Sequence, residues 1–450
     1  MSVRAAAPVR VPELLLALLT CIAGFALSLH LFYPGMATHD ALAVYDQAYA
    51  GRFGDWQPPL LGVIWIALEQ VLGYGPRAIF LPSAALYWLG FLLLFLGLRR
   101  SGARVAWLAL PVALLPPVFA LTGTIWRDVI FSILWLVGFG LVLASADRGR
   151  VWRTAALVPA GAIVLTGFLL RPNALFAAAP LLVYLAWPRD WRWRRLLVFA
   201  LPISAVLVGS TYAVNYLWLK ARQDHGLYSI FVFDLAGITH FSGENVFPIA
   251  WTPQELETLK AKCYNPAYWD AIWWRGCTFA MHKIDYDVPP GSKLFGSPRL
   301  RQAWIEAVLA HPLAYAEHRL NHFRVLLTGE LMVMFDQYRS GQYRFLLFKN
   351  ADYWRLETAV IWLNRETPLF RGGLWLALAL AAGLAALRFE QGRAKAAVLA
   401  LSSSGVVYTL TYLVFGVAAE YRYVYWTALS SLCAGIVVLA KWECDRRTVP

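Results

Sequence analysis

The topology of this chain depends on how residues 58–75, PPLLGVIWIALEQVLGYG, are assigned. The stretch is apolar enough to cross a membrane, but it opens with two prolines and carries Glu69 and Gln70. A helix that lies flat in the membrane interface needs only one apolar face, so its polar side chains can point away from the lipid. We therefore predict an interfacial helix here. A full crossing would reverse the sidedness of every later loop.

The composition of the whole chain is that of a membrane protein. Apolar residues make up 59% of its 450 positions and charged residues only 15%, whereas about a quarter of an average soluble domain is charged. Apolar stretches of about twenty residues recur, which is the length that crosses a hydrocarbon core of ~30 Å. We predict an all-α polytopic membrane protein with about ten transmembrane helices, near residues 11–32, 77–98, 103–123, 128–146, 154–171, 173–187, 196–218, 373–388, 395–416 and 423–441. The first span lacks a small-residue cleavage site, so we expect it to be retained.

The basic residues are concentrated in short loops on one side of these spans. Ten spans put both termini on that side. Its basic residues are Arg4, Arg10, Arg99, Arg100, Arg104, Arg148, Arg150, Arg153, Arg189, Arg192, Arg194, Arg195, Arg388, Arg393, Lys395, Lys441, Arg446 and Arg447, against the acids Glu13, Asp147, Asp190, Glu390, Glu443 and Asp445. Excess Lys and Arg in short loops marks the cytoplasmic side. The location of these basic residues therefore predicts cytoplasmic termini, and no nucleic-acid partner is needed to explain the net charge of +13.

Three parts of the chain follow from this topology. Residues 1–218 form an N-terminal membrane module whose first external loop covers 33–76, residues 219–372 form an external domain, and residues 373–450 form C-terminal membrane helices. Residues 219–372 are the only long block without a predicted span. The block is large enough for a small domain of its own.

Helix signals in the external domain are clear, and no strong strand pattern accompanies them. Thr252-Pro253-Gln254-Glu255 has the residues of a capping box with proline at the first helical position. A second helix is predicted from Ser297-Pro298 to about Ala310. A third, 313–327, is amphipathic with His and Arg on its polar side.

Two cysteines have a predicted role. Cys263 and Cys277 are the only cysteines in the external domain. In an oxidising compartment such a pair can close a disulfide.

The segment YPGMATHDALAVYDQAYAGRFGDWQPP (33–59) is a short acidic segment of the N-terminal module. It holds Asp40, Asp46, Asp55 and His39 beside the first span. Polar groups at a membrane face usually mark chemistry or transport, so we take Asp40 as the leading candidate for a catalytic carboxylate. The alternative is that Asp40 only caps the amphipathic helix that begins there, and that the other two acids are ordinary solvated residues.

Three further polar sites lie on the same predicted side. Trp126-Arg127-Asp128 stands between the third and fourth spans, Arg171 ends the fifth, and Glu420-Tyr421-Arg422-Tyr423 forms the last external turn. Arg127 could pair with Asp128, and Arg422 with Glu420. Arg171 has no acid nearby in sequence, which suits either the capture of a phosphate or simple snorkelling to the interface.

Evidence for a cofactor is weaker. His318 and His322 are one helical turn apart and could bind a metal, but no third ligand is spaced to join them. A divalent cation, Mg²⁺ or Mn²⁺, could bind at Asp40, because carboxylates that face a phosphate commonly share such an ion. The sequence contains no Walker pattern, nucleophile elbow or CxxC motif.

Several of these segments resemble, in order, those of the GT-C superfamily of glycosyltransferases. The resemblance is to bacterial relatives of protein O-mannosyltransferases, of lipid A aminoarabinose transferases and of serotype-converting O-antigen glucosyltransferases, and it spans most of the chain. The matching segments are His39-Asp40, Gln57-Pro58-Pro59-Leu60, Arg77 to Leu98, Arg99-Arg100, TIWRDVIFS (124–132), FDLAG (233–237), residues 311–323 and EYRYVYW (420–426). This chain has His39-Asp40 where the family often has Asp-Glu, and Gln57 where it has lysine.

The resemblance implies a GT-C-like helical membrane fold with its active site at the outer face. It implies an undecaprenyl-phosphate-linked sugar as donor, Asp40 in the position of the catalytic acid, and no nucleotide-sugar site. It also implies a bacterial inner membrane, with both termini cytoplasmic and the large domain periplasmic. The residues expected to bind substrate or donor are His39, Asp55, Gln57, Arg127, Asp128, Arg171, Glu420, Arg422 and Tyr423.

Three functions are compatible with these features. The first is transfer of a sugar to a lipid or polysaccharide acceptor of the cell envelope, such as lipopolysaccharide or O-antigen. The second is a polysaccharide polymerase or ligase, in which two lipid-linked substrates meet. The third is a lipid or solute transporter, but the inverted repeats and mid-membrane polar sites typical of transporters are not found in the sequence.

Overall fold

A computed structural model describes residues 9–146, 149–274, 276–286, 291–331, 333 and 349–447. The elements in these ranges are helices, and the described residues contain no β-strand, only isolated bridges between Met36 and Thr124 and between Tyr268 and Ala418. The predicted all-α class is confirmed. Of the loop charges named above, Arg4, Asp147 and Arg148 and the side chain of Arg150 lie outside the described residues.

The chain divides into two compact units, and each is described by itself. The membrane unit comprises residues 1–221, 332–409 and 422–450, and the second unit comprises residues 222–331 and 410–421. The expected external domain, 219–372, is therefore wider than the second unit. Its last helix, α16 (Ala351–Glu366), packs against α1 within the membrane unit.

Seven helices in the described residues are long and apolar enough to cross a membrane, so a multi-pass membrane protein is supported. They are α1 (Val11–Phe32), α4 (Arg77–Arg99), α7 (Arg127–Ser145), residues Val151–Leu170 of α8 (Arg150–Leu170), the segment Trp193–Trp218 that begins with α10 (Trp193–Tyr212), α18 (Arg393–Phe415), and the segment Tyr421–Arg446 that contains α19 (Tyr425–Arg446).

The count of ten spans is not confirmed. An eighth span exists if the helix pair Val105–Val112 and Pro116–Gly123, bent by 57°, is one crossing; the prolines at its centre break the helix. The two remaining predictions correspond to Pro172–Ala186, which contains α9 (Leu175–Ala186), and to α17 (Gly372–Leu387). At 1.5 Å per residue both are shorter than a hydrocarbon core of ~30 Å.

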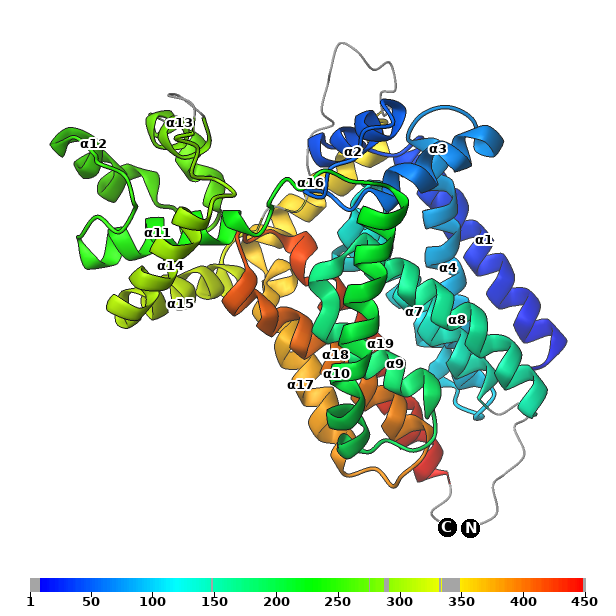
Figure 1. Ribbon diagram of the computed structural model, residues 1–450. Helices are drawn as coiled ribbons and strands as arrows, with labels where there is room; N and C mark the ends of the chain where they lie inside the picture. Colours follow the sequence, from blue (N-terminus) through cyan, green and yellow to red (C-terminus); the bar gives the residue numbers. More distant parts are fainter. Residues whose placement is uncertain are drawn as a thin grey trace. The chain divides into compact units, whose positions relative to one another are not determined.

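The stretch after Pro59 forms α3 (Leu60–Leu72), which has 13 residues. A helix of this length is about 20 Å long, too short to cross the bilayer, and this agrees with the predicted interfacial helix. Its acid is not solvated: Glu69 is buried and accepts hydrogen bonds from the Tyr45 and Tyr49 hydroxyls and from the Gly75 backbone N–H. Glu69 thereby joins α3 to α2 (His39–Tyr49), and both helices lie at the same end of the membrane unit (Figure 1).

Helix α7 is the centre of the membrane unit. It packs against α4 and α8, and 89% of the residues in its apolar 18-residue stretch are buried. In the segment Trp193–Trp218 the corresponding share is only 6%. Such a long exposed apolar surface is typical of a helix that contacts lipid.

The arginines assigned to one side by charge meet at one end of the membrane unit. Arg99 pairs with Glu13 at 2.6 Å, and Arg393 donates to the carbonyls of Gly97 and Leu143. Arg100 donates to the Ala144 carbonyl and Arg189 to that of Ala146. Guanidinium groups thus satisfy carbonyls that the ends of helices leave unpaired. We refer to this region as the basic end.

The second unit is built from α11 (Tyr228–Ser242), α12 (Pro253–Thr258), α13 (Thr278–Asp285), α14 (Pro298–Ala310) and α15 (Pro312–Thr328), drawn in green to yellow-green in Figure 1. The predicted capping box is present: Thr252 accepts from the Glu255 backbone N–H, and the Glu255 side chain accepts from the Thr252 backbone N–H. Helices α14 and α15 confirm the two other predicted helices.

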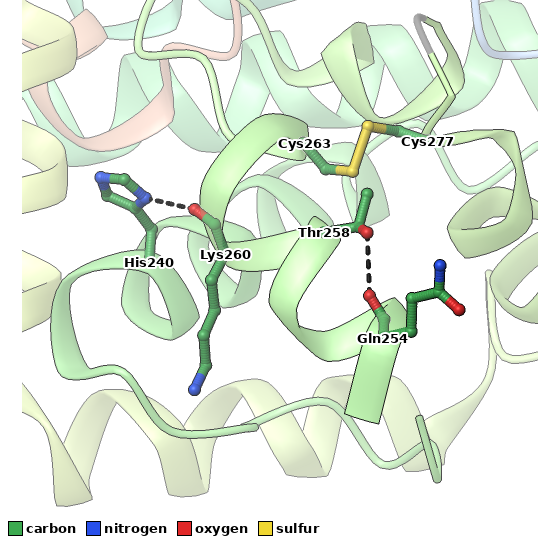
Figure 2. The surroundings of a disulfide bond; sticks show 6 residues. All are labelled: His240, Gln254, Thr258, Lys260, Cys263 and Cys277. Carbon is green, nitrogen blue, oxygen red and sulfur yellow. Dashed lines mark hydrogen bonds between the residues drawn. A yellow bond between two sulfur atoms is a disulfide. The ribbon is translucent and has the colours of Figure 1, made fainter. Parts of the chain in front are cut away.

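Cys263 and Cys277 form a disulfide, as the sequence predicted, with 5.6 Å between their Cα atoms. Both are buried in the core of the second unit, beside Leu259, Met281 and Ile284. Figure 2 shows the bond with two local hydrogen bonds, from the Thr258 hydroxyl to the Gln254 carbonyl and from the His240 ring to the Lys260 carbonyl. The disulfide fixes the end of the α12 segment to the start of α13.

Candidate functional site

Asp40 lies in the first turn of α2 and is not its N-cap. The N-cap is Thr38 and His39 is the first helical residue, so the alternative that Asp40 merely caps the helix is wrong by two positions. A carboxylate in the first helical turn still interacts favourably with the positive end of the helix dipole. Its side chain is 37% exposed, so a substrate can reach it.

Asp40 forms an ion pair with Arg422, in which Nη1 lies 2.9 Å from Oδ2. The predicted pairing of Arg422 with Glu420 stays a prediction, because Arg422 belongs to the membrane unit and Glu420 to the second unit, and each unit is described by itself. Burial opposes ionisation of Asp40, but the positive charges of Arg422 and Arg127 outweigh this effect and hold the pKa of Asp40 below its usual value. Asp40 is therefore a carboxylate at neutral pH.

Asp128 pairs with Arg171, not with its neighbour Arg127. The Arg171 Nε lies 2.9 Å from Asp128 Oδ1, and both side chains are almost fully buried. Adjacent residues of a helix point in different directions, so Arg127 and Asp128 at the start of α7 diverge. Arg171 follows the last residue of α8, which packs against α7, and this places its guanidinium beside Asp128.

The ring of Tyr423 lies within cation–π distance of two guanidinium groups. The Arg171 Cζ is 5.3 Å and the Arg422 Cζ 5.0 Å from its centroid. Arg422 also donates to the Tyr423 hydroxyl at 3.0 Å and lies 4.9 Å from the Trp126 ring. These aromatic rings hold the planar guanidinium groups in place without neutralising their charge.

Arg127 completes the group, which we name the arginine–aspartate cluster: Asp40, Arg127, Asp128, Arg171 and Arg422. Arg127 is within electrostatic reach of all four others. Its Nη1 is buried and has no hydrogen-bond partner among the described residues. Three guanidinium groups face two carboxylates, so the cluster has a surplus positive charge and a buried donor that a bound anion would satisfy.

The other predicted site residues have different surroundings. Asp55 accepts a hydrogen bond from the Tyr216 hydroxyl at 2.6 Å, and Gln57 is buried. His39 precedes Asp40 and adds to the positive potential that acts on it. Tyr216 was missed in the sequence, because it lies near the end of an apolar segment with no local signal of a polar partner.

Evidence for a metal site in the sequence is weak, with Asp40 as a candidate ligand. Within the described ranges no three His, Cys, Asp or Glu side chains are grouped in a way that could hold a metal. A divalent cation at Asp40 would therefore depend on oxygen ligands from a substrate.

The amphipathic pattern of 313–327 suggested that His318 and His322 lie on a solvated polar face, and this is wrong. Both are fully buried in the second unit, with Arg319 between them. Asp234 accepts hydrogen bonds from His318 Nε2 at 3.1 Å and Trp304 Nε1 at 2.7 Å, and it forms an ion pair with Arg319, whose Nη2 lies 2.6 Å away. Since His318 donates from Nε2, its Nδ1 accepts from the Tyr264 hydroxyl.

This buried network has a structural role. His322 donates from Nδ1 to the Pro266 carbonyl, and burial lowers the pKa of His322 from its usual value of 6.5 to about 4. Burial also lowers the pKa of His318. Gly237 allows the close approach of α15, because a Cβ there would lie 2.3 Å from the His318 ring. The network joins the segments FDLAG (233–237) and 311–323 into one core.

Comparison of the chain with protein-family models, with curated proteins and with solved structures returns no match.

Proposed function

We propose that the chain is a GT-C-type membrane glycosyltransferase that moves a sugar from a polyprenyl-phosphate-linked donor to a lipid or polysaccharide acceptor. The observation that carries the proposal is the ion pair between Asp40 and Arg422 within the arginine–aspartate cluster. Sugar transfer from such a donor needs a carboxylate for the acceptor hydroxyl and cations for the departing phosphate. The cluster offers both, and it does so where membrane helices end.

The arginines are assigned to the donor phosphate. Arg171 and Arg422 flank Tyr423, and Arg127 has a buried donor group with no partner among the described residues. Guanidinium groups bind phosphate oxygens through charge-assisted hydrogen bonds and stabilise the negative charge that develops as the sugar leaves. Asp128 keeps Arg171 in position through their buried pair.

Asp40 is assigned to the acceptor, as general base or as the carboxylate that positions the sugar. While paired with Arg422 it is a weak base, because its pKa is held low. A phosphate that binds Arg422 competes for the same guanidinium and weakens its hold on Asp40. Donor binding would in this way raise the proton affinity of Asp40 when the acceptor hydroxyl must be deprotonated.

The proposal includes an orientation. The arginine–aspartate cluster faces the periplasm of a bacterial inner membrane, the basic end faces the cytoplasm, and undecaprenyl phosphate carries the sugar. The acceptor is then a lipid or glycan of the cell envelope, such as lipopolysaccharide or O-antigen. His39, Asp55, Gln57, Glu420 and Tyr423 are proposed to shape the donor and acceptor sites.

The test replaces Asp40 by Asn in the full-length protein, assayed in membranes with a radiolabelled undecaprenyl-phosphate sugar. Loss of a general base is expected to reduce donor turnover ~10²–10⁴-fold. Asp46→Asn is the matched control, because Asp46 is an exposed residue of the same helix. Turnover of Asp40→Asn near the wild-type rate, at equal protein in the membrane, refutes the assignment of Asp40.

Product analysis separates the alternatives. Addition of a single sugar supports the transferase. A ladder of polymer lengths supports a polymerase or ligase that uses the same cluster. Movement of the intact donor into vesicles without chemical conversion supports a transporter.

A further inference from the structure

A cavity of about 420 Å³ lies at the basic end of the membrane unit, and the proposed function does not use it. It is formed where α10 begins, beside the turn that joins α17 to α18. Its lining residues are Trp191, Arg192, Trp193, Arg194, Leu387, Gln391, Lys395 and Leu399.

The cavity is remote from the outer loop that contains Asp40 and Asp55. Trp193 and Tyr216 lie near the two ends of one 26-residue helical segment, and Tyr216 is hydrogen-bonded to Asp55. At 1.5 Å per residue these two positions are about 35 Å apart. The cavity is therefore a separate site at the opposite end of the segment.

An unpartnered donor lines the cavity. The Trp191 side chain is 2% exposed, and its Nε1–H has no hydrogen-bond partner among the described residues. Gln391 donates to the Trp191 carbonyl at 3.0 Å and so fixes the backbone of this residue. A buried N–H without a partner is unfavourable, so an acceptor bound in the cavity would stabilise it.

The charge of the cavity is positive, since its lining contains no acidic residue. Arg192 is balanced by Asp190, which also binds Arg195. Arg194 is exposed and makes no ion pair in the described part of the chain. The Lys395 ammonium donates to the carbonyls of Leu387 and Phe389, which uses two of its three N–H bonds, and it forms no ion pair with any residue that the structure describes.

The apolar part of the lining identifies the source of the anion. Leu387 is 50% and Trp193 47% exposed, and Trp193 begins a segment whose apolar surface points outward. Tryptophan at the end of a span is typical of the headgroup level of a membrane. An acyl chain can therefore lie along Leu387 and Leu399 while its phosphate reaches the cations.

We propose that this cavity binds the phosphate-bearing headgroup of an anionic phospholipid. The Trp191 indole N–H donates to a phosphate oxygen, Arg194 and Lys395 supply the opposite charge, and the acyl chain packs on the leucines. Basic pockets between membrane helices are known to bind anionic headgroups in this way.

The experiment measures the thermal unfolding of the lipid-stripped, full-length protein in a neutral detergent. Palmitoyl-oleoyl phosphatidylglycerol is titrated against wild type, Arg194→Gln, Trp191→Phe and the control Arg153→Gln, an exposed arginine outside the lining. Phosphatidylglycerol is expected to raise the midpoint temperature of unfolding. Loss of the Arg194 charge should raise the half-saturating lipid concentration about fivefold, and Trp191→Phe should raise it as well, whereas Arg153→Gln should not.

Two controls identify the ligand. Phosphatidylcholine, which has no net charge, should stabilise the protein at least fivefold more weakly, and inorganic phosphate should have no effect at the same concentration. Equal titration curves for wild type and Arg194→Gln overturn the proposal, as does stabilisation by inorganic phosphate alone. If Trp191→Phe fails to fold, the exposed Arg194 still decides the outcome. Because no sugar transfer is measured, failure here is distinguishable from failure of the proposed function.

Discussion

Arg422 and Asp40 are 382 positions apart in the chain, yet the guanidinium Nη1 of Arg422 lies 2.9 Å from the Asp40 carboxylate. This pair brings a residue of the first loop together with one that follows the second unit. It also sets the protonation of Asp40, and so it connects the position of one side chain to the acid–base behaviour of the other.

The first prediction concerns the pH dependence of donor turnover. In wild type the pKa of Asp40 lies below its usual value because Arg422 and Arg127 outweigh the effect of burial, so activity that needs the carboxylate is lost only at low pH. Arg422→Gln removes the largest favourable charge, and the pKa of Asp40 rises. The acid limb of the kcat/KM profile should therefore move to higher pH. Arg422→Lys, which keeps the charge, should move it less; an unchanged limb in Arg422→Gln argues against Asp40 as the titrating group.

The second prediction concerns the buried pair of Asp128 and Arg171. Asp128→Asn removes the carboxylate that pairs with the buried Arg171 guanidinium, and breaking a buried ion pair typically costs about 3–5 kcal/mol of stability. The double variant Asp128→Leu with Arg171→Met removes both charges and should recover much of that loss. Thermal unfolding in detergent measures both. Recovery of stability without recovery of sugar transfer is expected if Arg171 binds the donor phosphate.

The third prediction concerns the acid sensitivity of the second unit. Burial lowers the pKa of His322 to about 4 from 6.5, so between these values the unfolded chain binds a proton that the folded chain does not. The stability of this unit is therefore complete above pH 6.5 and is lost progressively as the pH falls toward 4. The expected loss is roughly 3 kcal/mol. Hydrogen exchange of the α15 amides in the full-length protein at pH 7 and pH 5 provides the measurement.

A variant isolates the role of His322. His322→Asn keeps a donor for the Pro266 carbonyl but does not titrate. The protection factors of its α15 amides, which are exchange rates relative to those of an unfolded chain at the same pH, should depend less on pH than those of wild type. The same slope in both proteins would assign the acid sensitivity to another group.

The fourth prediction concerns the disulfide. Cys263 and Cys277 are 14 residues apart, and they are buried. Closing a loop of this size stabilises a fold by about 3 kcal/mol in the chain-entropy description. Cys263→Ser with Cys277→Ser should therefore accelerate proteolysis of the second unit. In protein from intact cells, alkylation of these two thiols should require a reductant; free thiols without it would place the unit in a reducing compartment.

The fifth prediction concerns sidedness. Asp46 of α2 is exposed, and Cys444 at the end of α19 is partly exposed. A membrane-impermeant maleimide should label Asp46→Cys in intact cells and should reach Cys444 only after permeabilisation. Labelling of both positions from the same side would contradict this topology: either α3 crosses the membrane, which would divide the proposed active site between two compartments, or one of the later predicted spans does not cross.

Much of the local structure was predictable from the sequence because its causes are local. The capping box at Thr252, the proline starts of α14 and α15, and the disulfide pair all depend on residues close together in the chain. Apolar length and arginine counts similarly predicted most spans and their shared basic end. The count of ten spans was not confirmed at Pro172–Ala186 and Gly372–Leu387, because hydropathy shows that a stretch is apolar but not how long its helix is.

The sequence by itself determined that this is a helical membrane protein with polar residues gathered in a few turns between apolar helices. Only the tertiary structure decided which of those residues pair. Arg422 pairs with Asp40, which is distant in sequence, and Asp128 pairs with Arg171 and not with its neighbour Arg127. Helix geometry points adjacent side chains apart, while packing of distant helices brings opposite charges together where burial makes an unpaired charge costly. Local proximity in sequence therefore carried little information about the cluster, whereas the packing of α7 against α8 and α19 brings most of its members together.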